Sequence, residues 1–160
     1  MQLRPDDPAF LAVAIEQARI GAAEGGVPVG AALVAGGVVL GAGRNRRIQD
    51  GSPIHHGETD ALAQAGRLSA STYAGATMFT TLSPCAMCTG AILLYGIPRV
   101  VIGENRTFLG EEDLLRSRGV EVVVVDDASC VAMMERFIAD RPEEWNEDIG
   151  VDDPPGAGGR

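Results

Sequence analysis

The chain has 160 residues, a formal net charge of −9 and no lysine, so arginine supplies all of its permanent side-chain cations. This length is typical of one domain, which we expect to span residues 1–150. Residues 151–160 (VDDPPGAGGR) are rich in Gly, Pro and Asp and are expected to form a disordered tail. So acidic a chain lacks the basic surface with which proteins neutralise phosphates, and we therefore expect no nucleic-acid partner.

The hydrophobic pattern gives no sign of a membrane or secreted protein. No apolar run approaches the roughly 18 residues of a membrane span, so no membrane partner is expected. Residues 1–7 (MQLRPDD) lack the apolar core of a signal peptide. Three cysteines, two of them in a C-x-x-C pair, suit a reducing compartment better than a disulfide framework. These features predict a cytoplasmic protein.

The first elements in chain order are a helix and two strands. Residues 5–24 predict an amphipathic helix, because apolar side chains recur there at helical spacing before a Gly-Gly pair. Residues 29–34 and 38–43 predict strands that pair across a tight Gly-Gly turn. Residues 44–47 follow them as a loop.

The rest of the chain alternates helices with strands. The predicted elements are a helix over 55–68, a strand over 76–81, a helix over 85–95, a strand over 99–103, a helix over 111–118, a strand over 120–125, and helices over 129–140 and 142–149. This alternation predicts parallel crossovers, and hence an α/β fold: a three-layer α/β/α sandwich around a five-stranded mixed sheet. The last strand is apolar at every position except Glu121, which predicts that the sheet is covered on both faces.

Two cysteines and one histidine have the spacing of a metal site. Cys85 and Cys88 lie one turn apart at the start of a predicted helix, so they face the same side, and the helix N-terminus favours their thiolate forms. His56, which begins another predicted helix, supplies a nitrogen ligand. Three protein ligands leave the fourth position of a Zn²⁺ ion open, and an open position is typical of a catalytic site.

Glu58 gives this site its chemistry. It follows His56 by two residues, so it can lie beside the zinc-activated water without binding the metal. There it can take a proton from the water and return it to the substrate as a general acid and base. H-x-E followed by P-C-x-x-C is typical of zinc-dependent deaminases.

Simpler interpretations of these residues remain open at this stage. A C-x-x-C pair can be a redox pair or half of a structural zinc ribbon, but a ribbon needs a second pair and only Cys130 remains. His55 is a second candidate ligand, although it has no glutamate two residues later. Asn45, which lies among arginines, is either a turn residue or a hydrogen-bonding partner of a substrate.

Longer stretches of the chain resemble the fungal-type zinc-dependent cytosine deaminases of the cytidine-deaminase-like superfamily. The similar stretches are 25–30 (GGVPVG), 56–58 (HGE), 80–92 (TTLSPCAMCTGAI), 95–99 (YGIPR), 101–105 (VIGEN), 121–127 (EVVVVDD) and 145–150 (WNEDIG). The resemblance implies a cytidine deaminase-like fold and a homodimer with one zinc per subunit. It also implies hydrolysis of free cytosine to uracil and ammonia in pyrimidine salvage, with 5-fluorocytosine as a further substrate.

The resemblance assigns roles to individual residues as well. His56, Cys85 and Cys88 would hold zinc, and Glu58 would move protons. In the substrate pocket, Asn45 would hydrogen-bond the base, the Gly57 N–H would bind its carbonyl oxygen, and Asp148 would accept a ring N–H. The Ser83 carbonyl would accept a hydrogen bond from the amino group, and Val29 would line the wall. Phe108 and Trp145 would cover the opening on a flap that gates product release.

Five positions depart from the family pattern. His55 replaces an apolar residue, Thr59 and Asp60 replace an Ile-Ser-like pair, Asn146 replaces an aromatic flap residue, and Val29 replaces isoleucine. These departures bear on substrate breadth rather than on the reaction.

Other functions compete with deamination of free cytosine. The same chemistry would serve another small amino-heterocycle such as guanine, or an adenine on tRNA, although the net charge of −9 disfavours the latter. A catalytically inactive, zinc-stabilised interaction module belongs to another class of protein. Glu58 argues against it, because a structural zinc site has no use for that carboxylate.

Overall fold

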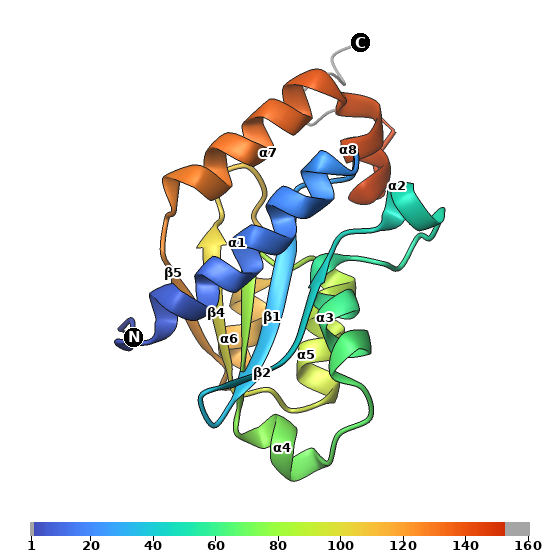
Figure 1. Ribbon diagram of the computed structural model, residues 1–160. Helices are drawn as coiled ribbons and strands as arrows, with labels where there is room; N and C mark the ends of the chain where they lie inside the picture. Colours follow the sequence, from blue (N-terminus) through green and yellow to red (C-terminus); the bar gives the residue numbers. More distant parts are fainter. Residues whose placement is uncertain (1, 153–160) are drawn as a thin grey trace.

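The sheet is mixed, with five strands in the order β2-β1-β3-β4-β5 (Figure 1). The strands are β1 (Gly30–Ala35), β2 (Val38–Arg44), β3 (Ala76–Leu82), β4 (Arg99–Glu104) and β5 (Glu121–Val124). β1 is antiparallel to both β2 and β3, whereas β3, β4 and β5 are parallel. This computed structural model describes residues 2–152, so residues 153–160 of the predicted tail lie outside the described part.

Helices cover both faces of the sheet, which confirms the predicted three-layer sandwich. The helices that pack on the sheet are α1 (Asp7–Ala23) and α7 (Ala128–Asp140) on one face, and α3 (Gly57–Ala65), α5 (Ala86–Leu94) and α6 (Glu112–Ser117) on the other (Figure 1). Within residues 2–152, no helix combines the length and the apolar character that crossing a membrane requires.

The core has one layer on each side of the sheet. Phe79 and Val101 pack with the buried residues of α1 and α7. Met78, Val100 and Ile102 point the other way and pack with α3, α5 and α6. The central strands β3 and β4 are therefore buried on both faces, as is usual for parallel strands between helices.

Three short helices complete the chain, and two of them were not predicted. These are α2 (Arg47–Asp50) and α4 (Ala70–Ala74), whereas α8 (Pro142–Asp148) was expected. The single helix predicted over residues 55–68 was wrong at its end. It stops at Ala65 because Gly66 has a φ of +79°, and Ser69 then caps α4 by accepting the Thr72 N–H at 3.2 Å.

Glycines in β2 let α3 approach the sheet closely. A Cβ atom at Gly43 would lie 2.4 Å from the Ala61 nitrogen, and one at Gly41 would lie 2.4 Å from the Ala65 nitrogen. No larger residue fits without moving α3. The placement of α3 matters because His56 and Glu58 lie at its N-terminal end.

A buried ion pair joins the start of α1 to β4. Both guanidinium NH₂ groups of Arg99 donate to the Asp7 carboxylate, at 2.8 and 2.7 Å, and both side chains are buried. Burial raises the pKa of Asp7, but the hydrogen bonds and charge of Arg99 outweigh burial and hold it below its ordinary value. The two-pronged geometry makes this a strong form of ion pair.

We expect Asp7→Asn to lower the free energy of unfolding by about 3 kcal/mol at pH 7, because the guanidinium is left buried without its charge partner. Since the folded-state pKa is lowered, the contribution is full above the unfolded pKa and is lost as pH falls through the folded pKa. The difference from wild type should therefore hold from pH 7 to about pH 5 and shrink below about pH 4. Urea denaturation at several pH values measures it. Arg4→Ala, which removes an exposed pair with Glu121, is the control and should cost less than about 1 kcal/mol.

Candidate metal centre and active site

The candidate metal ligands lie just beyond the carboxyl end of β3, where two helices begin. His56 is the N-cap of α3, Cys85 is the N-cap of α5, and Cys88 lies in the first turn of α5. The positive ends of both helix dipoles therefore point toward the same small region. Such a location favours thiolates over neutral thiols.

The three ligand atoms have the separations expected around one ion. The sulfur atoms of Cys85 and Cys88 lie 3.4 and 3.6 Å from Nδ1 of His56, and all three atoms lie within 4.8 Å of one another. Ligands about 2.0–2.3 Å from a tetrahedral zinc lie roughly 3.5 Å apart, so the donor set fits Zn²⁺. Within residues 2–152, no fourth His, Cys, Asp or Glu joins this group, which leaves a coordination position for water or substrate.

The three ligand side chains shift one another's pKa values. The pKa of Cys85 is lowered to about 4, chiefly by a hydrogen bond from Cys88 and also by His56, whereas that of Cys88 is raised by its bond to Cys85 and by burial. Burial opposes protonation of His56, but Cys85 and the negative charge of Asp148 raise its pKa to about 9. A bound Zn²⁺ would displace these protons, because it binds thiolates and neutral imidazole.

Two contacts position His56, one at its backbone and one at its ring. Thr59 Oγ1 accepts the His56 N–H at 3.0 Å and donates to the Ile54 carbonyl at 2.7 Å, which fixes the start of α3. Nε2 of His56 lies 3.4 Å from a carboxylate oxygen of Asp148, so Nδ1 faces the cysteines. His55, the alternative ligand, points instead to Asp50 at the exposed surface, 3.0 Å away, and is not part of the cluster.

Glu58 lies beside the cluster without belonging to it. Its side chain is buried and accepts a hydrogen bond from the Thr80 hydroxyl of β3. Burial raises the pKa of Glu58, and the neighbouring charge of Cys85 raises it further. A raised pKa makes the carboxylate a better proton acceptor, which suits a general acid and base.

A small cavity of about 20 Å³ opens beside these groups. It has room for a water molecule but not for a pyrimidine ring. The predicted pocket residues that line it are Val29, Asn45, Ser83, Phe108, Trp145 and Asp148, together with His56, Glu58 and Cys85. Gly57 is not among the lining residues, although it is the first residue of α3, where helix N–H groups have no intrahelical partner. The prediction missed Leu82 and Ile149, whose apolar side chains also face the cavity.

Asn45 and Asp148 lie 103 positions apart in the sequence, but their side chains are hydrogen-bonded. Asn45 Nδ2 donates to Asp148 at 2.7 Å, and Asn45 Oδ1 accepts the Arg47 N–H at 3.1 Å. Burial raises the pKa of Asp148, while His56, Asn45 and Arg47 oppose that rise. The Asn45 side chain is thus held in place at the cavity, which is more than a turn residue requires.

The loop that carries Asn45 is fixed by Asp60, whose role the sequence did not reveal. The buried Asp60 carboxylate accepts the Arg44 N–H at 2.9 Å and Nε of Arg46 at 3.2 Å. It lies four residues after His56, and that helical spacing is the one signal that could have placed it near the site. Thr59 and Asp60 therefore support the site from outside, and neither lines the cavity.

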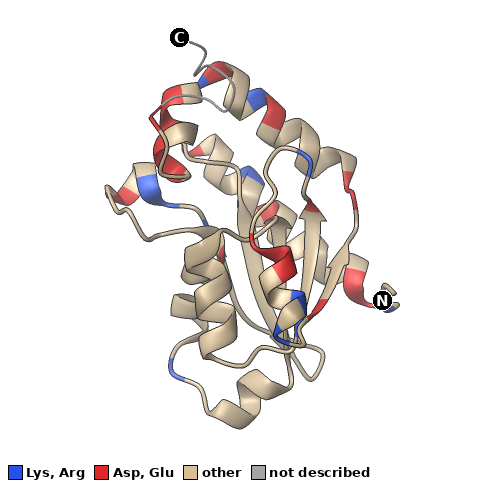
Figure 2. Ribbon diagram, turned by 180° about the vertical axis from the view of Figure 1, so that it is seen from behind, with Lys and Arg blue, Asp and Glu red and all other residues tan. Residues whose placement is uncertain are grey.

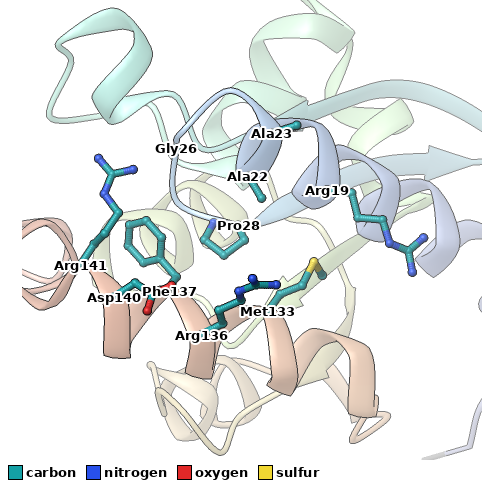
Figure 3. A pocket seen from close by; sticks show the side chains of 10 residues that line it. All are labelled: Arg19, Ala22, Ala23, Gly26, Pro28, Met133, Arg136, Phe137, Asp140 and Arg141. Atoms are coloured by element: carbon teal, nitrogen blue, oxygen red, sulfur yellow. The ribbon is translucent and has the colours of Figure 1, made fainter.

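A larger hollow, of about 500 Å³, lies between α1 and α7 (Figure 3). Its wall includes Met133, Phe137 and three arginines. Arg141, one of these, donates to the Gly25 carbonyl and pairs with Glu144. None of the predicted site residues lines this hollow, and we assign the chemistry to the smaller cavity.

Residues 4–104 match the family described as the cytidine and deoxycytidylate deaminase zinc-binding region. This match includes the three candidate ligands and Glu58. The chain belongs to this family of zinc-binding deaminases, which confirms both the predicted family and the expected zinc cofactor.

Individual relatives agree with this assignment. The chain is 54% identical over 146 residues to the cytosine deaminase of Candida albicans, which covers 91% of this chain and 97% of that protein. A solved structure from work on A-to-I editing by tRNA:A34 deaminases matches with a TM-score of 0.68 and 25% identity, over 79% of this chain and 99% of that chain. A guanine deaminase from Nitrosomonas europaea matches with a TM-score of 0.65, over 87% of each chain. At 23% identity, this last likeness shows the fold alone.

Proposed function

We propose that the protein hydrolyses free cytosine to uracil and ammonia, with 5-fluorocytosine as a further substrate and pyrimidine salvage as its role. The observation that carries this proposal is the Asp148 carboxylate, whose side chain is only 6% exposed and which lines the same cavity as Glu58 and His56. A free base has an N–H where a nucleoside carries its sugar. Asp148 would accept that N–H, whereas a nucleoside has no N–H to offer there and would place its sugar against the carboxylate.

Each residue of the site has its own role in the proposed reaction. Zinc held by His56, Cys85 and Cys88 supplies a Lewis acid that activates water. Glu58 takes a proton from the water and delivers protons to the ring nitrogen and to the departing amine, so that cytosine and water become uracil and ammonia. The Ser83 carbonyl meets the amino group.

The other side of the base faces α3 and the asparagine loop. Asn45 and the Gly57 N–H would bind the carbonyl oxygen side of the ring, and Val29 would form part of the apolar wall. These contacts orient the ring so that the carbon bearing the amino group faces the metal.

The flap formed by Phe108 and α8 would have to open for cytosine to enter and for uracil to leave. Phe108 and Trp145 meet edge to face above the cavity, with ring centroids 5.9 Å apart and planes at 85°. The cavity of about 20 Å³ is smaller than the base, which supports this gating role.

The test of this function is product identification. Zinc-loaded protein given cytosine should release one ammonia per uracil formed, as measured by a coupled ammonia assay and by NMR of the base. No release from cytosine, or release from guanine alone, would rule out the proposal.

We further propose that two chains form a homodimer through the face made by α4, α5 and the end of α3. α4 and α5 contain no charged residue, and Figure 2 shows this end of the molecule almost free of charge. Leu94 is 75% exposed and Tyr95 is 42% exposed there. Exposed apolar side chains grouped on uncharged helices are typical of subunit interfaces.

Leu94→Arg should convert this dimer to a monomer, because it places a charge in an apolar interface. Sedimentation velocity of the zinc-loaded protein measures the change. Val38→Arg is the matched control: Val38 is also exposed but lies in the β1–β2 hairpin, and its replacement should leave the dimer intact. A wild-type monomer, or a Leu94→Arg dimer, would contradict the proposed interface.

The acidic net charge of −9 supports a free base rather than tRNA as substrate. None of the three cysteines forms a disulfide among the described residues, which supports a cytoplasmic location.

A further inference from the structure

Glu112 is a buried carboxylate that takes no part in the proposed reaction. It lies in the first turn of α6 and is 2% exposed. One of its oxygens accepts a hydrogen bond from the Ser83 hydroxyl at 2.6 Å, and the other lies 3.3 Å from the Asn105 amide nitrogen and 3.4 Å from Arg116. A carboxylate this buried is stable only because these donors surround it.

The Ser83 hydroxyl connects Glu112 to the loop before α6. A hydroxyl has one proton, so donating it to Glu112 leaves its lone pairs free to accept the Gly110 N–H at 2.9 Å. The neighbouring Glu111 N–H donates to the Pro84 carbonyl at 3.0 Å. The end of the loop is thereby held against the segment that leads into Cys85.

A second buried carboxylate holds the start of the same loop. Glu104, at the end of β4, is fully buried and accepts the N–H groups of Arg106 and Thr107 at 2.7 and 3.0 Å, as well as the Thr107 hydroxyl. Phe108 lies between the two anchors and packs against Trp145 over the cavity. Its position therefore depends on contacts at both ends of the loop.

We propose that Glu112 is a positioning residue for substrate binding: through the Ser83 hydroxyl and the Gly110 N–H, it holds Phe108 in place as the roof of the pocket. The proposal rests on the deaminase function proposed above. Without Glu112 the Ser83 hydroxyl can turn away from the Gly110 N–H, so the end of the loop keeps only the hydrogen bond from Glu111 to Pro84, and Phe108 covers the base for less of the time. Glu58 and the metal ligands lie on other elements, so the loss falls on binding rather than on the chemical step.

In zinc-loaded Glu112→Ala, the KM for cytosine should rise about tenfold, the effect of a lost hydrogen bond to a charged group. The kcat should change by less than about threefold, because the interaction lost is one of binding. Ser83→Ala, which removes the hydroxyl and keeps the backbone carbonyl, should have the same effect. Glu112→Gln should restore the KM, since its amide oxygen can still accept from Ser83. Glu111→Ala is the matched control: it removes an adjacent, exposed glutamate and should leave both constants unchanged.

Two further measurements separate positioning from a general loss of stability. In the Phe108→Ala background, Glu112→Ala should raise the KM no further, because the residue through which it acts is gone. Trp145 is the chain's one tryptophan and is 5% exposed, so its fluorescence should shift to the red in Glu112→Ala and Ser83→Ala as Phe108 moves away.

An unchanged KM in Glu112→Ala, effects that add to those of Phe108→Ala, or an unshifted Trp145 spectrum would each overturn the proposal. If Glu112→Ala loses its zinc through poor folding, Ser83→Ala carries the same test. Failure of the wild-type protein to act on cytosine would instead overturn the proposed function, and the fluorescence comparison would still test the position of Phe108.

Discussion

Glu58→Gln should abolish nearly all turnover of cytosine while the protein keeps one zinc per chain. The amide has nearly the shape of the carboxylate and can still accept the Thr80 hydroxyl proton, so the fold and the metal ligands are undisturbed. It cannot take up a proton from water at neutral pH. General acid–base catalysis contributes about 10²- to 10⁴-fold, and because Glu58 would serve several proton transfers, we expect a loss at or beyond the upper end.

Steady-state ammonia release and zinc analysis of the same preparation test this expectation together. Glu16→Gln, at an exposed position on α1, is the control and should behave like wild type. A Glu58→Gln protein that stays active would remove Glu58 from the proton path. One that loses its zinc would show that Glu58 supports the metal rather than the substrate.

The second large effect concerns the metal ligands. Cys88→Ala and His56→Ala should each bring the zinc content close to zero and abolish activity, because two ligands cannot replace a three-ligand site. The metal-free proteins should also unfold at lower temperature, since the free energy of metal binding contributes to folding. Atomic absorption and thermal unfolding measure the two consequences.

The chain contains a matched control for each substitution. Cys130→Ala changes the one remaining cysteine, and His55→Ala changes the one remaining histidine. Cys130 is a buried residue of α7 and His55 faces Asp50, so both variants should keep zinc and activity. Retention of zinc in His56→Ala combined with its loss in His55→Ala would show that His55, and not His56, is the zinc ligand.

The sequence predicted the parts of this molecule that depend on local spacing. Cys85 and Cys88 lie one turn apart, His56 and Glu58 share a helix start, and two glycines make the hairpin, so each pattern is contained in a few neighbouring residues. Their meeting in space follows from the order of strands and helices.

Contacts between distant segments could not be predicted from such patterns. From the local pattern alone, Asn45 was either a turn residue or a substrate contact, and only the family resemblance assigned Asp148 to the site. The structure shows a hydrogen bond of 2.7 Å between the two side chains, both of which are largely shielded from solvent. Glu112 gave no signal at all, because its partner Ser83 is 29 positions away. The break between α3 and α4 depends on the backbone conformation of Gly66, which a helical pattern of apolar residues does not reveal.

Three of the departures from the family pattern now have a place in the structure. Thr59 and Asp60 fix the start of α3 and the loop of Asn45, and His55 lies at the surface. None of these three side chains lines the cavity, whereas Val29 does. Asn146 is buried in α8 beside Trp145, and it too lies outside the lining. The wall that would contact the base is therefore unchanged at these positions except for the smaller Val29.

The most direct test of the account is the ratio of kcat/KM for cytosine to that for cytidine, measured with the zinc-loaded wild-type protein. A pocket in which buried Asp148 accepts the ring N–H of a free base should reject the nucleoside strongly, by a factor of about 10⁴ or more. Comparable values for the two substrates would contradict the role of Asp148, and with it the proposal that this deaminase acts on the free base.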